Sequence, residues 1–84
     1  MEQVIQRNCE KQWPNDFLMR AHCVEQQQNA VEELKKGCPA DIPEEIFLQI
    51  RRNAVSQWPD DFVMRHHTER QQMEAYRKLQ RRNQ

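Results

Sequence analysis

Neighbouring metal-ligating side chains stand at two places in the sequence, His22-Cys23 and His66-His67. Imidazole nitrogen and thiolate sulfur are the ligands that zinc prefers. Adjacent residues on a helix point about 100 degrees apart, and no His or Cys has another three or four positions away, so one helix cannot supply two ligands to one ion. A zinc site would need His22 and His67 to converge from separate helices. The sequence therefore ranks a metal-binding sensor third among functions and predicts no resident cofactor.

Two of the side-chain pairs in the chain are of types used in catalysis. Cys23 beside His22 could act as nucleophile and base, but these side chains diverge on a helix and Thr68 holds the matching position in the second half of the chain. Asp60 and Asp61 form a carboxylate pair, yet two acids after a proline are explained by capping of a helix. A single glycine excludes a Gly-rich phosphate loop. The sequence therefore predicts that the protein is not an enzyme.

The elements that carry these residues are predicted to be helices. One glycine and no run of Val, Ile and Thr leave no sign of a sheet. Apolar residues recur at helical spacing over about 3–12, 15–36, 43–57 and 60–82. The expected fold class is all-α, with two tandem helical hairpins packed as a small four-helix unit. The expected single domain of 84 residues holds repeat 1 at 1–36, a linker at 37–42 and repeat 2 at 43–82.

One motif occurs twice. Trp13-Pro14-Asn15-Asp16-Phe17-Leu18-Met19-Arg20 returns forty-five positions later as Trp58-Pro59-Asp60-Asp61-Phe62-Val63-Met64-Arg65. Proline moves the residue before it out of the helical region, and the acid caps the helix that follows. The motif thus predicts a hinge, with each Trp over the Phe of the next helix. The predicted hinge residues are Trp13, Pro14, Asp16, Phe17, Trp58, Pro59, Asp61 and Phe62.

The linker carries its own boundary signals. Gly37 can end the second helix in a left-handed cap. Asp41 and Glu44 have the spacing of a capping box, with Pro43 in the first turn of the third helix.

The second helix of each pair is the longer one. The first spans about 15 Å and the second about 30 Å, so the second overhangs its partner. We expect Ile46 and Phe47 of the third helix to cover the overhang of the second. The overhang of the fourth helix has no follower, so only the N-terminal helix or another molecule can cover it; we favour another molecule and expect a homodimer. The residues of this surface are Met73, Tyr76 and Leu79.

The charge of the chain bears on whether it binds nucleic acid or lipid. A formal net charge of zero gives no global field toward nucleic acid or acidic lipid. The last helix is nevertheless basic, so a nucleic-acid-binding regulator is the alternative function. Its contacts would be Arg70, Arg77, Lys78, Arg81 and Arg82.

Three cysteines, Cys9, Cys23 and Cys38, with no C-x-x-C pair predict reduced thiols. We see no secretory leader pattern after Met1 and no apolar stretch long enough to cross a membrane. We expect a cytoplasmic protein that does not bind membranes.

The second copy of the motif, Trp58-Pro59-Asp60-Asp61-Phe62-x-Met64 followed by Gln71, Gln72, Ala75 and Tyr76, resembles a known sequence pattern. It is similar to a short aromatic-Pro-Asp-Asp-aromatic-x-Met helical repeat of small uncharacterised bacterial proteins. The first copy departs from the pattern, with Asn15 for the first Asp and Val31 for the Tyr. The resemblance implies the hinge and helical register but no activity. By elimination, the sequence predicts a small helical protein–protein interaction module or regulatory adaptor whose partner is another protein.

Overall fold

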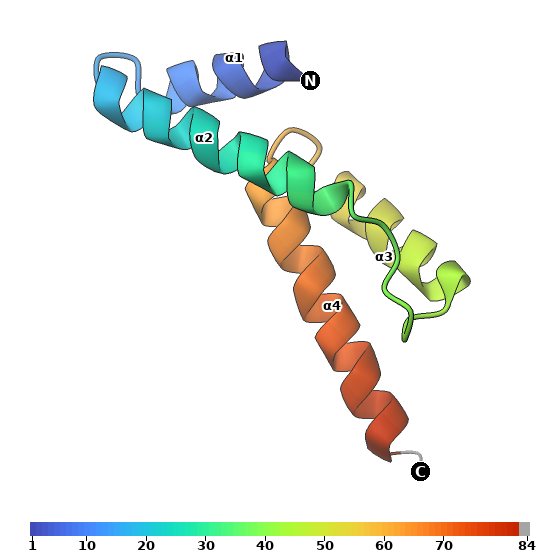
Figure 1. Ribbon diagram of the computed structural model, residues 1–84. Helices are drawn as coiled ribbons and strands as arrows, with labels where there is room; N and C mark the ends of the chain where they lie inside the picture. The colour runs from blue at the N-terminus through green and yellow to red at the C-terminus, as the bar shows by residue number, and fades with distance from the viewer. Residues whose placement is uncertain (83–84) are drawn as a thin grey trace.

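The computed structural model describes residues 1–82, which fold into four helices arranged as two hairpins (Figure 1). Within each hairpin the two helices pack side by side, α1 on α2 and α3 on α4. The expected all-α, four-helix class is confirmed. The helices are α1 (Glu2–Gln12), α2 (Phe17–Leu34), α3 (Glu44–Gln57) and α4 (Phe62–Arg82).

Both short helices stop just before a proline. Trp13 follows α1 with φ −131° and ψ 66°, and Trp58 follows α3 with φ −131° and ψ 69°. The steric restriction on a residue before proline accounts for this extended backbone. The two copies of the motif therefore share their backbone geometry at the tryptophan as well as their sequence.

The linker departs from one expectation. Gly37 takes a positive φ of 83°, the conformation that a glycine after a helix adopts without steric cost. Pro43 occupies the N-cap position of α3. Asp41, expected to form a capping box with Glu44, binds the Arg77 guanidinium through both carboxylate oxygens instead. The capping-box prediction is wrong because α3 begins at Glu44 with Pro43 as its N-cap, so that Asp41 lies two residues before the capping position.

The two hairpins meet where α4 begins, against the C-terminal half of α2 (Figure 1). We expected Ile46 and Phe47 to cover this part of α2, and that prediction is wrong because Phe62 occupies the place. Helix α3 reaches α2 through Arg51, which donates to the Leu34 carbonyl at 2.7 Å. The buried core at the meeting point consists of Ile5, Cys9, Cys23, Ala30, Val31 and Phe62.

The molecule is elongated, with extents of 53 × 19 × 19 Å. The first hinge lies at one end, and the last turns of α4 project beyond the other helices at the opposite end (Figure 1). Over residues 1–82, no helix combines the length and apolar character that crossing a membrane requires.

Candidate interaction surface

An arginine closes each hinge. Arg20 donates from Nε to the Trp13 carbonyl at 3.3 Å and from its terminal nitrogen to the Pro14 carbonyl at 2.7 Å. Arg65 makes the same pair of bonds in the second hinge. Carbonyls at a helix end lack partners in their own helix, and the fork of N–H groups on a guanidinium can serve two of them. These arginines are structural hinge residues that the sequence reasoning missed, although both were part of the repeated motif.

An aspartate starts the helix after each hinge. The Asp16 carboxylate accepts from the Met19 amide at 3.0 Å, and the Asp61 carboxylate accepts from the Met64 amide at 3.1 Å. This is the bond that an N-cap aspartate makes to a helix amide left without a helical partner.

The rings of the hinge are arranged differently from the expectation. Guanidinium carbons, not indoles, lie over the phenylalanine rings: Arg20 is 4.9 Å from the Phe17 centroid and Arg65 is 4.8 Å from that of Phe62. The Trp58 indole turns to α4 and donates from Nε1 to Thr68 Oγ1 at 3.1 Å. The prediction that Trp covers Phe is replaced by a cation–π contact in both hinges.

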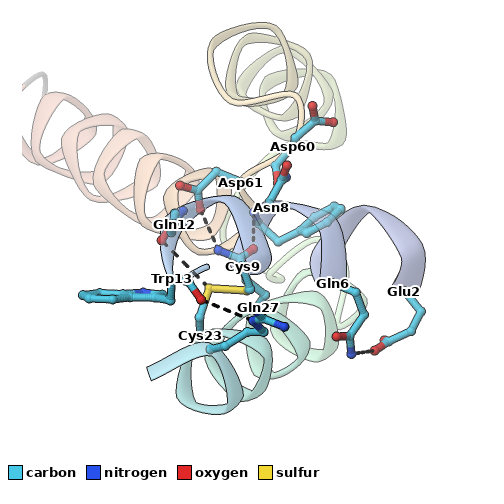
Figure 2. The surroundings of a disulfide bond; sticks show 12 residues. Glu2, Gln6, Asn8, Cys9, Gln12, Trp13, Cys23, Gln27, Asp60 and Asp61 are labelled. Carbon is cyan, nitrogen blue, oxygen red and sulfur yellow. Dashed lines mark hydrogen bonds between the residues drawn. A yellow bond between two sulfur atoms is a disulfide. The ribbon is translucent and has the colours of Figure 1, made fainter. Parts of the chain in front are cut away.

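The second hinge docks on the first hairpin through two amide side chains (Figure 2). Gln27 donates from Nε2 to Asp61 Oδ1 at 3.0 Å and accepts from the Phe62 backbone amide at 2.8 Å. Asn8 donates to the Asp60 carbonyl at 2.8 Å. Gln27 is only 8% exposed, and both ends of its amide are satisfied at this contact. We call this contact the joint.

The same positions in the first hinge face solvent. Phe17 is 74% exposed and Leu18 is 81% exposed, whereas Phe62 is 5% exposed and Val63 packs against the core. The prediction that Phe17 seals its own hairpin is therefore wrong. Phe62 is buried because it packs against the α1–α2 hairpin, and Phe17 has no preceding hairpin to pack against. We call Asp16, Phe17 and Leu18 the hinge tip.

The predicted surface on α4 is partly covered. Met73 and Tyr76 are half-buried, and Leu79 is exposed. Tyr76 and Leu79 hold the positions that Val31 and Leu34 hold in α2. In α2, Val31 and Leu34 pack in or against the core cluster that contains Phe62 of the second hinge. Tyr76 and Leu79 therefore lie on the face of α4 that corresponds to this contact surface of α2.

The five basic residues of α4 that were predicted to contact nucleic acid fall into two groups. Arg77 is bound to Asp41 and lies 3.6 Å from Glu74, and its hydrogen bond lowers the pKa of the Asp41 carboxyl. The others are exposed, and two of them lie in the last turn, where positive charge complements the helix dipole. The exposed group is Arg70, Lys78, Arg81 and Arg82.

The two candidate metal ligands lie apart. His22 lines a hollow with Trp13 and Asp61, while His67 lines another hollow along α4 with Met73. Nowhere in residues 1–82 do three His, Cys, Asp or Glu side chains gather in a way that could hold a metal ion.

A disulfide joins α1 to α2 through Cys9 and Cys23 (Figure 2). The prediction of reduced thiols is therefore wrong for these two residues. The sequence held one signal for the pair, because Cys9 shares the inward stripe of Ile5 and must face α2. Cys38 lies exposed in the linker, where its Sγ is 3.1 Å from the Ile42 carbonyl.

The chain matches no protein-family description, no curated protein and no solved structure.

Proposed function

We propose that the protein is a small helical protein–protein interaction module, a regulatory or adaptor protein without catalytic activity. The observation that carries the proposal is the exposure of Phe17 and Leu18 at the hinge tip, where the second copy of the motif buries the matching residues. Exposed apolar side chains that lie next to each other can form a site of protein association.

The chemistry of the hinge tip supports a protein partner. Arg20 and Asp16, its neighbouring charged residues, are bonded within the hinge. The tip therefore presents an aromatic and an aliphatic side chain, of the kind that anchors protein interfaces when buried by a partner. The Phe17 ring lies beneath the Arg20 guanidinium, which limits its motion and lowers the entropy lost on binding.

A nucleic-acid-binding regulator is the second candidate, supported by the exposed basic side chains of Arg70, Lys78, Arg81 and Arg82 on α4. Phosphate contacts need free cations. The pairing of Arg77 with Asp41 and Glu74 removes one of the five cations expected to serve. We rank this candidate second for that reason and because the chain has a net charge of zero.

The cysteines bear on the compartment. Disulfides persist in oxidising compartments and are rare in the reducing cytoplasm. The Cys9–Cys23 disulfide thus opposes the predicted cytoplasmic location. Alkylation of protein taken directly from cells, followed by mass spectrometry, decides between an oxidising compartment and the cytoplasm. Cytoplasmic protein should carry alkyl groups on all three cysteines.

A photo-crosslinking experiment in the native cells tests the proposed function. A benzophenone amino acid replaces Leu18 at the hinge tip, and the matched control replaces Leu48, which is 49% exposed on α3. We expect protein adducts at position 18 that are absent at position 48. Equal yields at both positions, or no protein adduct at position 18, would contradict the proposal. Ultraviolet crosslinks from α4 to nucleic acid would then favour the second candidate.

A further inference from the structure

We propose that the hinge tip of one molecule docks on the α3–α4 hairpin of a second copy, as the second hinge docks on the α1–α2 hairpin within the chain. This inference rests on the proposed function and names its partner. The contact would be head-to-tail, because the docking surface and the surface that receives it lie on different parts of the chain.

The docking half of the joint is present twice. In the second hinge, Asp61 Oδ1 accepts from both the Met64 amide and Gln27. In the first hinge, Asp16 Oδ1 accepts from the Met19 amide in the same way, and its side chain is exposed to a further donor. The amide of Phe17 stands at the start of α2, where helix amides lack a partner in their own helix.

The receiving half is also present twice. In repeat 1 it consists of Asn8 and Gln27, which make the polar bonds, with Ala30 buried beside them. The residues forty-five positions later have the same types and are all exposed. These residues, which we call the receiving face, are Asn53, Gln72 and Ala75.

Folding of the second hairpin does not require this face. Exposed Asn and Gln side chains contribute little to the stability of a hairpin, and most surface substitutions change stability by less than about 0.5 kcal/mol. Yet Asn53 and Gln72 have the types and register that hold the joint in repeat 1. Tyr76, half-buried beside them in place of Val31, offers an aromatic surface on which the Phe17 ring can pack.

One contact of the joint region is not duplicated. Within the chain, Arg51 also donates to the carbonyl of Leu34. The residue at the matching position of repeat 1 is Gln6, which is shorter and uncharged. The contact between copies should therefore be weaker than the joint, and assembly should depend on protein concentration.

The hinge tip and the last turns of α4 lie at opposite ends of the elongated molecule (Figure 1). A docked copy would still expose its own hinge tip or receiving face. Such heterologous contacts build open chains or rings rather than stopping at a twofold dimer.

Sedimentation of two one-sided variants tests this inference on the purified, oxidised full chain. The docking variant is Phe17→Ala with Leu18→Ala, and the receiving variant is Gln72→Ala with Ala75→Arg. All four residues are exposed, so circular dichroism spectra should match the wild type. Leu48→Ala, at another exposed apolar residue, is the control.

We expect the average mass of wild type and control to rise from 10.3 kDa past that of a dimer between micromolar and millimolar concentration. Each variant alone should associate at least about tenfold more weakly than the wild type, because the docking variant loses apolar surface and the receiving variant puts a long charged side chain at the contact. An equimolar mixture should form a heterodimer and nothing larger, since each partner retains the half that the other lacks. Formation of this heterodimer also shows that both variants are folded.

Three results would overturn the inference. They are a wild type that stays monomeric, variants that assemble like the control, and a mixture that stays monomeric while the wild type assembles. A monomeric wild type together with position-18 adducts to a different protein would reject self-docking while leaving the proposed function in place. A monomeric wild type together with no protein adducts at position 18 would reject both.

Discussion

Phe17 and Phe62 occupy the same place in two copies of one motif, and only Phe62 is buried. Both rings lie beneath the guanidinium of an arginine three residues later in the sequence. They differ because the second hinge follows a hairpin on which it can dock, and the first hinge follows none. The first hinge therefore presents a docking group that residues 1–82 leave uncovered.

The joint can be tested by a pair of matched glutamines. Gln27→Ala would leave the Phe62 amide and the Asp61 carboxylate without their partner in a largely buried place. We expect the free energy of unfolding to fall by about 2 kcal/mol, as for other polar groups left unsatisfied in a protein interior. Urea unfolding at dilute, monomeric concentration is the measurement.

Its control is Gln72→Ala, the exposed counterpart on α4. This change should leave the stability of the monomer within about 0.5 kcal/mol of the wild type. Equal losses for the two glutamines would show that the hairpins are not joined through Gln27.

The hinge arginines should be irreplaceable by lysine. Arg65→Lys keeps the charge but loses the fork that serves the Trp58 and Pro59 carbonyls. We expect a loss of about 1 to 2 kcal/mol, because hydrogen bonds to charged groups contribute more than neutral ones. Thermal unfolding followed by circular dichroism measures it, with the exposed Arg52→Lys as the control. A melting temperature unchanged by Arg65→Lys would show that the arginine fork does not stabilise the hinge.

The disulfide should stabilise the first hairpin, whose second copy does without one. Cys9 and Cys23 are 14 residues apart, and a bridge over a loop of that size contributes about 3 kcal/mol. Cys9→Ala with Cys23→Thr installs the pair that repeat 2 carries at Ala54 and Thr68. We expect this variant to unfold at lower urea than the oxidised wild type and to show no response to reductant. Cys38→Ser should behave as the wild type; a reductant that leaves wild-type stability unchanged would contradict the role given to the bridge.

An ion pair between a buried carboxylate and a partly exposed arginine distinguishes the second hairpin. Glu69 is 3% exposed and binds Arg51 through both carboxylate oxygens, at 3.0 and 3.2 Å. Arg51→Gln would leave this carboxylate buried without its cation, and we expect a loss of about 2 to 3 kcal/mol, less than for a fully buried pair because Arg51 is partly exposed.

Adding Glu69→Val recreates the Gln6 and Val24 combination of repeat 1 and should recover most of that stability. A double-mutant cycle from urea unfolding measures the recovery. A double variant no more stable than Arg51→Gln alone would contradict the importance of the unpaired charge.

Much of the local structure was predictable from the sequence. Helical spacing of apolar residues and the two Trp-Pro steps placed four helices and two hinges, because these signals act over one or two turns. Asp16 and Asp61 as helix caps follow from the same local chemistry.

The placement of the hairpins was not predictable by these means. Both α3 and α4 had apolar residues available to cover the end of α2, and periodicity does not rank them. The deciding contacts are Gln27 with Asp61 and Phe62, which join residues more than thirty positions apart through a polar side chain. The pairing of Cys9 with Cys23 was missed for a similar reason, since it depends on the packing of α1 against α2 and not on a spacing motif.

The crosslinking yield at position 18 in the native cells reports directly whether the hinge tip contacts another protein. We expect protein adducts from the hinge tip and none above background from position 48 on α3. A hinge tip that captures no protein, or no more than position 48 does, would contradict a protein-interaction function for this surface.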